Sequence, residues 1–112
     1  MKAGIIGLGA MGLRHLQAAR SVSGVDAVAV CDSRQAALDA PAVAGVPRRY
    51  LSHTDLLAHE KLDVAVIAAT APSHRALVEA CVDAGVKRIL CEKPLACSVA
   101  DGQAILDACA RA

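Results

Sequence analysis

Three glycines near the start of the chain have the spacing of a phosphate-binding turn. An apolar run over residues 3–6 ends in Gly7-Leu8-Gly9-Ala10-Met11-Gly12, and an amphipathic segment follows directly. Such a turn between a strand and a helix lets a pyrophosphate approach the backbone and lets the helix pack close to the sheet. The free N–H groups of the first helical turn, which begins at Ala10 and Met11, would attract the phosphates.

A carboxylate further along the chain supports the same interpretation. A second apolar run, broken only by Asp26, ends in Cys31-Asp32, and Asp32 lies about 20 residues after Gly12, where a dinucleotide-binding fold places the acid that binds the adenosine ribose. Glycine-rich turns also occur for steric reasons alone, and Asp32 also suits a helix N-cap. With strand, turn, helix and acid in register, the pattern favours dinucleotide binding. Ser33 and Arg34 follow at once, and Arg34 is either an adenine or 2′-phosphate contact or an ordinary exposed arginine.

Lys93 is the candidate for chemistry. It stands in Glu92-Lys93-Pro94-Leu95, directly after another apolar run. A lysine at the carboxyl end of a strand can donate to a substrate oxygen and can stabilise the alkoxide that develops during hydride transfer. The alternative is an exposed lysine that happens to end a strand.

Alternating strands and helices must position these residues. Apolar runs predict strands over residues 2–7, 26–31, 48–51, 64–69 and 87–92. Helices are predicted over residues 10–22, from residue 33 to before Pro41, from the Ser52 capping box to residue 59, from residue 70 to a C-cap at Gly85, and from the Ser98 capping box onward. The inner face of the last helix is predicted to be Gly102, Ile105, Leu106 and Cys109. This order predicts an α/β fold of Rossmann type, a doubly wound parallel sheet with strand order 3-2-1-4-5, whose ligand lies beyond the first and fourth strands.

Composition limits the classes of function. Hydrophobic residues make up 55% of the 112 residues, which is enough for the core of one domain. The formal net charge is +1 and Tyr50 is the only aromatic residue, so neither a nucleic-acid surface nor a membrane surface is indicated. No apolar stretch approaches the ~18 residues of a membrane span, and no signal-peptide pattern is present, so we expect a cytoplasmic protein. The five cysteines form no C-x-x-C pair, and we expect reduced, mostly buried thiols and no metal site.

The order of these motifs resembles the N-terminal domain of the glucose–fructose oxidoreductase/inositol dehydrogenase/MocA family. The resemblance covers nearly the whole chain, and Glu-Lys-Pro after the fifth strand is its most specific mark. The segments that carry it are Gly7-Leu8-Gly9-Ala10-Met11-Gly12, Cys31-Asp32, residues 63–70, Pro72-Ser73-His74, Ala84-Gly85 and Glu92-Lys93-Pro94-Leu95.

The resemblance implies a cofactor, NAD or else NADP, and a set of contacts. The residues expected to contact the cofactor are Gly7, Gly9, Ala10, Met11, Gly12, Asp32, Ser33, Arg34, Thr70, Pro72, His74, Glu92, Lys93 and Pro94. Glu92 and Pro94 would hold Lys93 in place, and Lys93 would be the catalytic residue.

The resemblance also implies a second α/β domain that this chain lacks, together with a sixth strand. We expect residues 1–112 to be one dinucleotide-binding domain of a longer two-domain oxidoreductase that forms a homo-oligomer. That enzyme would transfer a hydride between the cofactor and a sugar, cyclitol or similar hydroxyl compound bound through the second domain. A stand-alone module that binds or senses a dinucleotide without chemistry is the alternative. The other histidines, His15, His53 and His59, are expected to be ordinary packing or surface residues.

Overall fold

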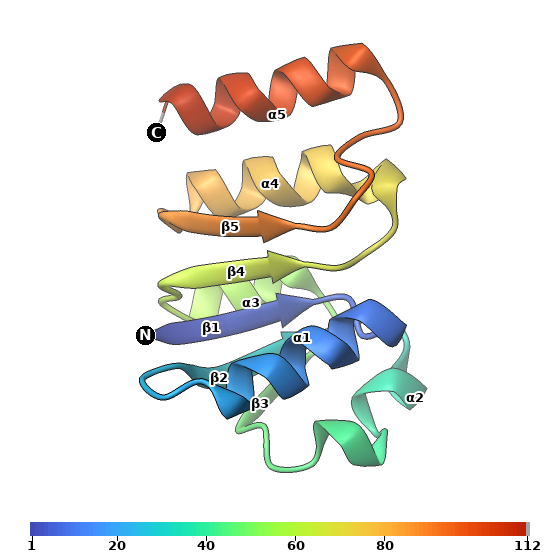
Figure 1. The fold of residues 1–112 in the computed structure, drawn as a ribbon, viewed down its shortest axis with the longest axis vertical. Helices are drawn as coiled ribbons and strands as arrows, with labels where there is room; N and C mark the ends of the chain where they lie inside the picture. The colour runs from blue at the N-terminus through green and yellow to red at the C-terminus, as the bar shows by residue number, and fades with distance from the viewer. Residues whose placement is uncertain (112) are drawn as a thin grey trace.

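Five parallel strands form one sheet in the order β3-β2-β1-β4-β5, which confirms the predicted strand order. The computed structural model describes residues 1–111. The arrowheads of β1, β4 and β5 point toward the same edge of the sheet (Figure 1), so the segments after them meet there. The strands are β1 (Lys2–Ile6), β2 (Asp26–Cys31), β3 (Arg48–Tyr50), β4 (Val64–Ile67) and β5 (Arg88–Cys91).

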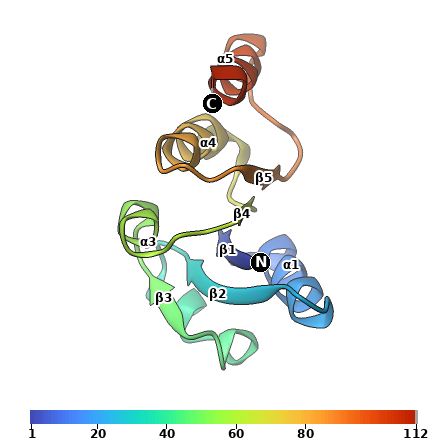
Figure 2. The same cartoon turned by 90° about the vertical axis from the view of Figure 1, so that its left-hand side faces the viewer.

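Helices cover both faces of the sheet. Figure 2 shows α1 on one face and α3 and α4 on the other, while α5 packs against α4. No helix among residues 1–111 is both long enough and apolar enough to cross a membrane. The α-helices are α1 (Ala10–Ser21), α2 (Gln35–Leu38), α3 (His53–His59), α4 (His74–Asp83) and α5 (Val99–Arg111), and the two 3₁₀ helices are η1 (Pro41–Val43) and η2 (Ala71–Ser73).

The core consists of two apolar layers, one on each face of the sheet. Successive strand residues point to opposite faces, so Ile5 packs in the layer with Leu16 of α1, and Ile6 packs in the layer with Leu77 of α4. Each such side chain contributes roughly 1.5–3 kcal/mol when it is fully buried. Both layers hold the carboxyl ends of β1 and β4 in a fixed register, in which Ile6 pairs with Ile67. The predicted site begins directly after these two residues.

Capping residues of α3, α4 and α5 lie at, or within one residue of, the helix ends where the sequence predicts them. The Ser52 hydroxyl accepts a hydrogen bond from the Thr54 N–H at 3.1 Å, and the Ser98 hydroxyl accepts one from the Asp101 N–H at 3.1 Å. Gly85 follows Ala84, the C-cap of α4, and has a φ of +82°, a left-handed conformation that glycine adopts without strain. The predicted Ser52 and Ser98 caps are therefore confirmed, and the predicted C-cap of α4 is off by one residue, because Ala84 is the C-cap and Gly85 follows it.

Two further predicted details of the helices are wrong. The inner face of α5 carries Ile105 and Ala108, whereas Leu106 is 57% exposed and Cys109 is also exposed. The helix turns the stripe that contains Ile105 and Ala108 toward α4, a rotation that local spacing does not determine. Helix α2 is one turn long, because the residues after Asp32 form a turn in which its carboxylate binds the Arg34 N–H.

The prediction of mostly buried thiols is only partly correct. All five cysteines are free, but only Cys31 and Cys81 are buried, and Cys97 and Cys109 are exposed. Burial raises the pKa of both Cys31 and Cys81 to about 11. These two thiols stay protonated at neutral pH and behave as small apolar side chains.

Candidate functional site

A cleft of about 900 Å³ opens at the carboxyl ends of β1, β2 and β4. Strand order reverses between β1 and β4, which is the point where open α/β sheets bind ligands. The predicted residues that line the cleft are Gly7, Gly9, Asp32, Ser33, Arg34, Thr70 and Pro72.

The three glycines of the first turn have different structural roles. Gly7 has a φ of +97°, and a Cβ there would lie 2.6 Å from the Ala69 backbone nitrogen. A Cβ on Gly12 would lie 1.8 Å from the carbonyl oxygen of Gly7. Apart from residues 8–10 themselves, no atom of residues 1–111 lies within 4 Å of the position that a Cβ on Gly9 would take. The fold therefore requires glycine at positions 7 and 12. At Gly9, the absence of a side chain leaves space that a ligand could occupy.

The N-terminus of α1 faces this space with its donors available. Gly9 is the N-cap and supplies no side-chain hydrogen bond, and the first turn contains no acidic residue. The first N–H groups of a helix have no partner within it, and they carry a partial positive charge. Ala10 and Met11 are exposed there. The turn and the helix end together fit a pyrophosphate.

Asp32 supplies a carboxylate to the cleft directly beside the glycine turn, and it is 8% exposed. Its Oδ2 accepts a hydrogen bond from the Leu8 N–H and its Oδ1 from the Arg34 N–H, both at 2.9 Å. The Arg34 guanidinium donates to both oxygens, at 3.0 and 3.1 Å. These bonds, the Arg34 side chain first, lower the pKa of Asp32 to about 2. The carboxylate is therefore ionised at neutral pH.

The Asp32–Arg34 pair affects how a ligand could use the acid. A carboxylate offers about four lone-pair positions, and the two backbone N–H groups and the guanidinium occupy them. The Arg34 side chain is 65% exposed, so water screens the pair and the side chain has room to move. A ribose that binds Asp32 through both hydroxyls must displace the Arg34 side chain and not the backbone donors.

The segment after β4 lies partly in the cleft and partly behind it. Thr70 and Pro72 line the cleft. His74 is fully buried, with Nε2 2.7 Å from the Ala69 carbonyl oxygen and Nδ1 3.0 Å from the Leu95 carbonyl oxygen. Both ring nitrogens thus face the protein's own backbone. This geometry does not support the predicted contact between His74 and a cofactor, and it gives the ring a structural role.

The Glu-Lys-Pro motif follows β5 and does not line the 900 Å³ cleft. Glu92 Oε1 lies 2.7 Å from His15 Nε2, and this hydrogen bond lowers the pKa of Glu92. Lys93 and Pro94 are exposed. No carboxylate among residues 1–111 forms an ion pair with Lys93. The structure thus brings Glu92 against α1 and leaves the Lys93 ammonium free to meet another group.

Sequence reasoning missed two histidines at the site. His15, expected to be an ordinary helix residue, contacts Glu92 across 77 positions of the chain. His53, expected to be on the solvated surface, lines the cleft together with Leu51 and Ser52. The sequence could have placed His53 at the cleft, because this residue follows the third strand and the carboxyl ends of parallel strands lie along one edge of the sheet. No local pattern relates His15 to Glu92.

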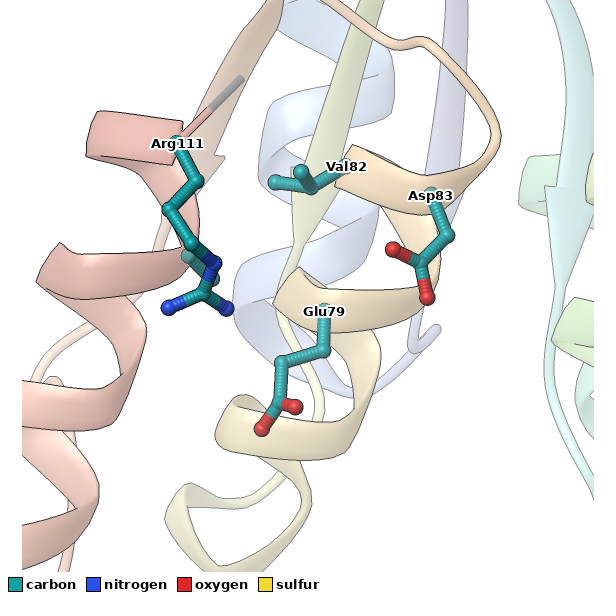
Figure 3. Close-up of a pocket in the computed structure, with 5 residues that line it drawn as sticks. Glu79, Val82, Asp83 and Arg111 are labelled. Carbon is teal, nitrogen blue, oxygen red and sulfur yellow. The ribbon is translucent and has the colours of Figure 1, made fainter.

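A second cavity, of about 280 Å³, lies away from these residues. Figure 3 shows Glu79, Val82 and Asp83 on α4 and Arg111 extending from α5 toward them. None of the predicted site residues lines this cavity, and its mixed charges are typical of the surface between two helices.

Comparisons with known proteins agree with this geometry. The family model described as "Oxidoreductase family, NAD-binding Rossmann fold" matches residues 1–112. The chain is 44% identical over 112 residues to a D-apiose dehydrogenase of Paraburkholderia graminis, covering 99% of the chain and 30% of that protein. It is 40% identical over 113 aligned positions to an inositol 2-dehydrogenase of Salmonella paratyphi B, covering 96% and 33%.

A solved structure shows the same fold. The crystal structure of an oxidoreductase from Agrobacterium radiobacter in complex with NAD⁺, L-tartaric acid and magnesium matches with a TM-score of 0.91 and 34% identity, over 99% of this chain and 32% of that one. The chain thus spans about a third of the length of the relatives it matches.

Proposed function

Because the chain belongs to the oxidoreductase family with an NAD-binding Rossmann fold, we propose that the cleft at the carboxyl ends of β1, β2 and β4 binds NAD. Gly7, Gly9 and Gly12, with the first turn of α1 at Ala10 and Met11, would bind the pyrophosphate. The adenosine ribose would meet Asp32, with Ser33 and Arg34 beside it, and Thr70 and Pro72 would border the cofactor.

One observation carries this proposal. The space above Gly9 and the Asp32 carboxylate belong to the same cleft, at the edge where the strand order reverses. The start of α1 offers N–H donors with a partial positive charge, and Asp32, which adjoins the glycine turn, offers an ionised acceptor. These groups are complementary to a molecule in which a pyrophosphate lies next to a ribose diol.

We further propose that the whole protein is an oxidoreductase acting on a sugar, cyclitol or similar hydroxyl compound. NAD supplies the hydride acceptor for such a reaction. Lys93, held by Glu92 and Pro94 near the cofactor, would donate a hydrogen bond to the reacting oxygen and stabilise its developing negative charge. The relatives named as dehydrogenases of apiose and inositol support this reading over a stand-alone binding module.

Four wider expectations are part of the same proposal. A two-domain organisation, with residues 1–112 as the cofactor domain, is supported by relatives about three times as long as the region they share with this chain. Substrate contacts would come from the second domain. Homo-oligomerisation and a cytoplasmic location stay predictions from the sequence.

Replacing Gly9 with valine tests the proposed cofactor site. The new side chain enters space that no protein atom occupies, so the fold should persist while the path of the pyrophosphate is blocked. We expect NAD affinity measured by titration calorimetry to fall by at least about tenfold, the loss of roughly 1.4 kcal/mol. Gly102→Ala is the matched control, because a Cβ there would make an ordinary 3.9 Å contact with Ala96, away from the cleft. A folded Gly9→Val variant with normal affinity would refute the site.

Cofactor preference should follow from the charge of Asp32. The carboxylate is ionised at neutral pH and would repel the 2′-phosphate of NADP at close range. We expect NADP to bind at least about tenfold more weakly than NAD. Asp32→Asn removes the charge and frees Arg34, so it should reduce the difference in affinity between NAD and NADP. Competitive titration measures the relative affinity of the two cofactors, and tighter NADP binding by the wild-type chain would show that the predicted preference is wrong.

A further inference from the structure

The segment that carries Lys93 is held at both of its ends by histidines from different helices. His15 of α1 contacts the side chain of Glu92, and His74 of α4 contacts the backbone of Leu95. Only Lys93 and Pro94 lie between these two positions, and both are exposed. The sequence interpretation gave neither histidine this role.

The His15 contact extends to the backbone of Lys93. Glu92 Oε1 lies 2.7 Å from His15 Nε2, while Glu92 Oε2 accepts a 3.3 Å hydrogen bond from the Lys93 N–H. The Glu92 N–H also donates to the Ile67 carbonyl oxygen at 2.9 Å, which ties the same residue to β4. The side chains of His15 and Glu92 are 22% and 19% exposed. Glu92 is therefore held through its backbone and its carboxylate, and it in turn holds the Lys93 amide.

The His74 contact joins two strand ends. The imidazole is fully buried, and its nitrogens face the Ala69 carbonyl oxygen after β4 and the Leu95 carbonyl oxygen after β5. A neutral imidazole has one N–H and donates to one of them, whereas the imidazolium donates to both. Buried polar groups are costly without partners. The buried ring, packed between these two carbonyl groups, therefore links the segment after β4 to the segment after β5.

We propose that His15 and His74 are positioning residues that together fix Lys93 relative to the cofactor cleft. α1 begins at the glycine turn and α4 follows the cleft-lining residue Pro72, so the elements that border the cleft also hold the lysine. The inference rests on the proposed function for its catalytic consequence, but the geometry can be tested without a cofactor. A displacement of 1 Å in a catalytic group can reduce the rate by about a hundredfold, so the two contacts would matter for turnover.

The first experiment measures the 92–95 segment directly by NMR of the chain. His15→Leu removes the donor to Glu92, and His15→Gln retains a side-chain N–H at a similar reach. We expect His15→Leu to shift the Lys93 amide resonance and to raise its hydrogen-exchange rate by about tenfold or more, the sign of local opening. His15→Gln should restore both values. His59→Gln is the control, because His59 is exposed on α3 and contacts the Asp55 carbonyl and the Tyr50 ring instead.

The His74 contact needs a variant that keeps the fold. His74→Gln retains one donor in the buried space, so we expect a folded protein with faster exchange at the Lys93 amide. His74→Leu should give a larger effect or lose the folded spectrum. Exchange rates and resonances at Lys93 that stay unchanged in both His15→Leu and folded His74→Gln would overturn the proposal.

A kinetic measurement then separates positioning from cofactor binding. In the complete oxidoreductase, His15→Leu should lower kcat by about tenfold or more while the KM for NAD stays within about threefold, with recovery in His15→Gln. Equal losses in kcat and in NAD affinity would contradict a positioning role. If the wild-type chain binds no NAD, the proposed function fails, and the exchange measurements still decide whether the histidines hold the segment.

Discussion

Replacing Gly12 with alanine is expected to unfold the chain or nearly so. The added Cβ would lie 1.8 Å from the Gly7 carbonyl oxygen, a backbone atom that the β1–α1 turn holds in place. Relief requires α1 to move away from the sheet and from its buried contacts through Leu16. We expect a loss of more than about 3 kcal/mol, against a total stability of about 5–15 kcal/mol for a typical domain. Urea denaturation followed by circular dichroism measures it.

Gly9→Ala is the matched control for this prediction. The same methyl group is added three positions earlier in the same turn, where no atom of residues 1–111 outside residues 8–10 lies within 4 Å. We expect its stability to stay within about 0.5 kcal/mol of wild type. Alanine is a better helix former than glycine by about 1 kcal/mol, so a Gly12→Ala variant as stable as wild type would mean that the close packing of α1 on the turn is wrong.

Replacing Lys93 with methionine is expected to have the largest effect on catalysis. Methionine has a similar length and no charge, so the variant removes the proposed donor to the reacting oxygen. In the complete oxidoreductase, kcat/KM should fall by about a hundredfold or more, as for the loss of one oxyanion donor. NAD affinity should change much less, because Lys93 does not line the cleft proposed for the cofactor.

Lys87→Met provides the comparison. Lys87 is also exposed and precedes β5, at the opposite end of the strand from Lys93. The same loss of charge there should leave kcat/KM within about twofold of wild type, as for a surface change far from any site. Near-normal turnover by Lys93→Met would mean that Lys93 has no role in catalysis. The chain would then be a cofactor-binding domain with no identified catalytic residue.

Local patterns were sufficient for the elements and for one side of the site. The uninterrupted apolar run at residues 64–69 indicates a strand buried on both faces, and β4 lies inside the sheet, between β1 and β5. Gly7, Gly9 and Asp32 could be placed at one cleft from spacing alone, because the turn, the helix and the next strand are consecutive in the chain. Their separate tasks could not be assigned from spacing: only the distances around each Cβ position distinguish Gly9 from its neighbours.

Contacts between distant segments were decided by the tertiary structure. His15 and Glu92 lie 77 positions apart, and they meet because β1, β4 and β5 are adjacent and α1 packs beside the end of β5. His74 is placed by its position in the helix, but the carbonyl groups it faces come from two separate loops. Likewise, which side of α5 is buried depends on how that helix rotates against α4.

The sequence by itself determined a parallel α/β sheet with a phosphate-binding turn and an acid in register, because strand, turn and helix signals act over a few residues. The tertiary structure alone decided that Arg34 occupies the Asp32 carboxylate, that His53 joins the cleft, and that two histidines hold the segment around Lys93. Except for the Asp32–Arg34 pair, these contacts join separate elements. Their geometry is set by side-chain packing and hydrogen bonding in three dimensions, which no periodicity along the chain encodes.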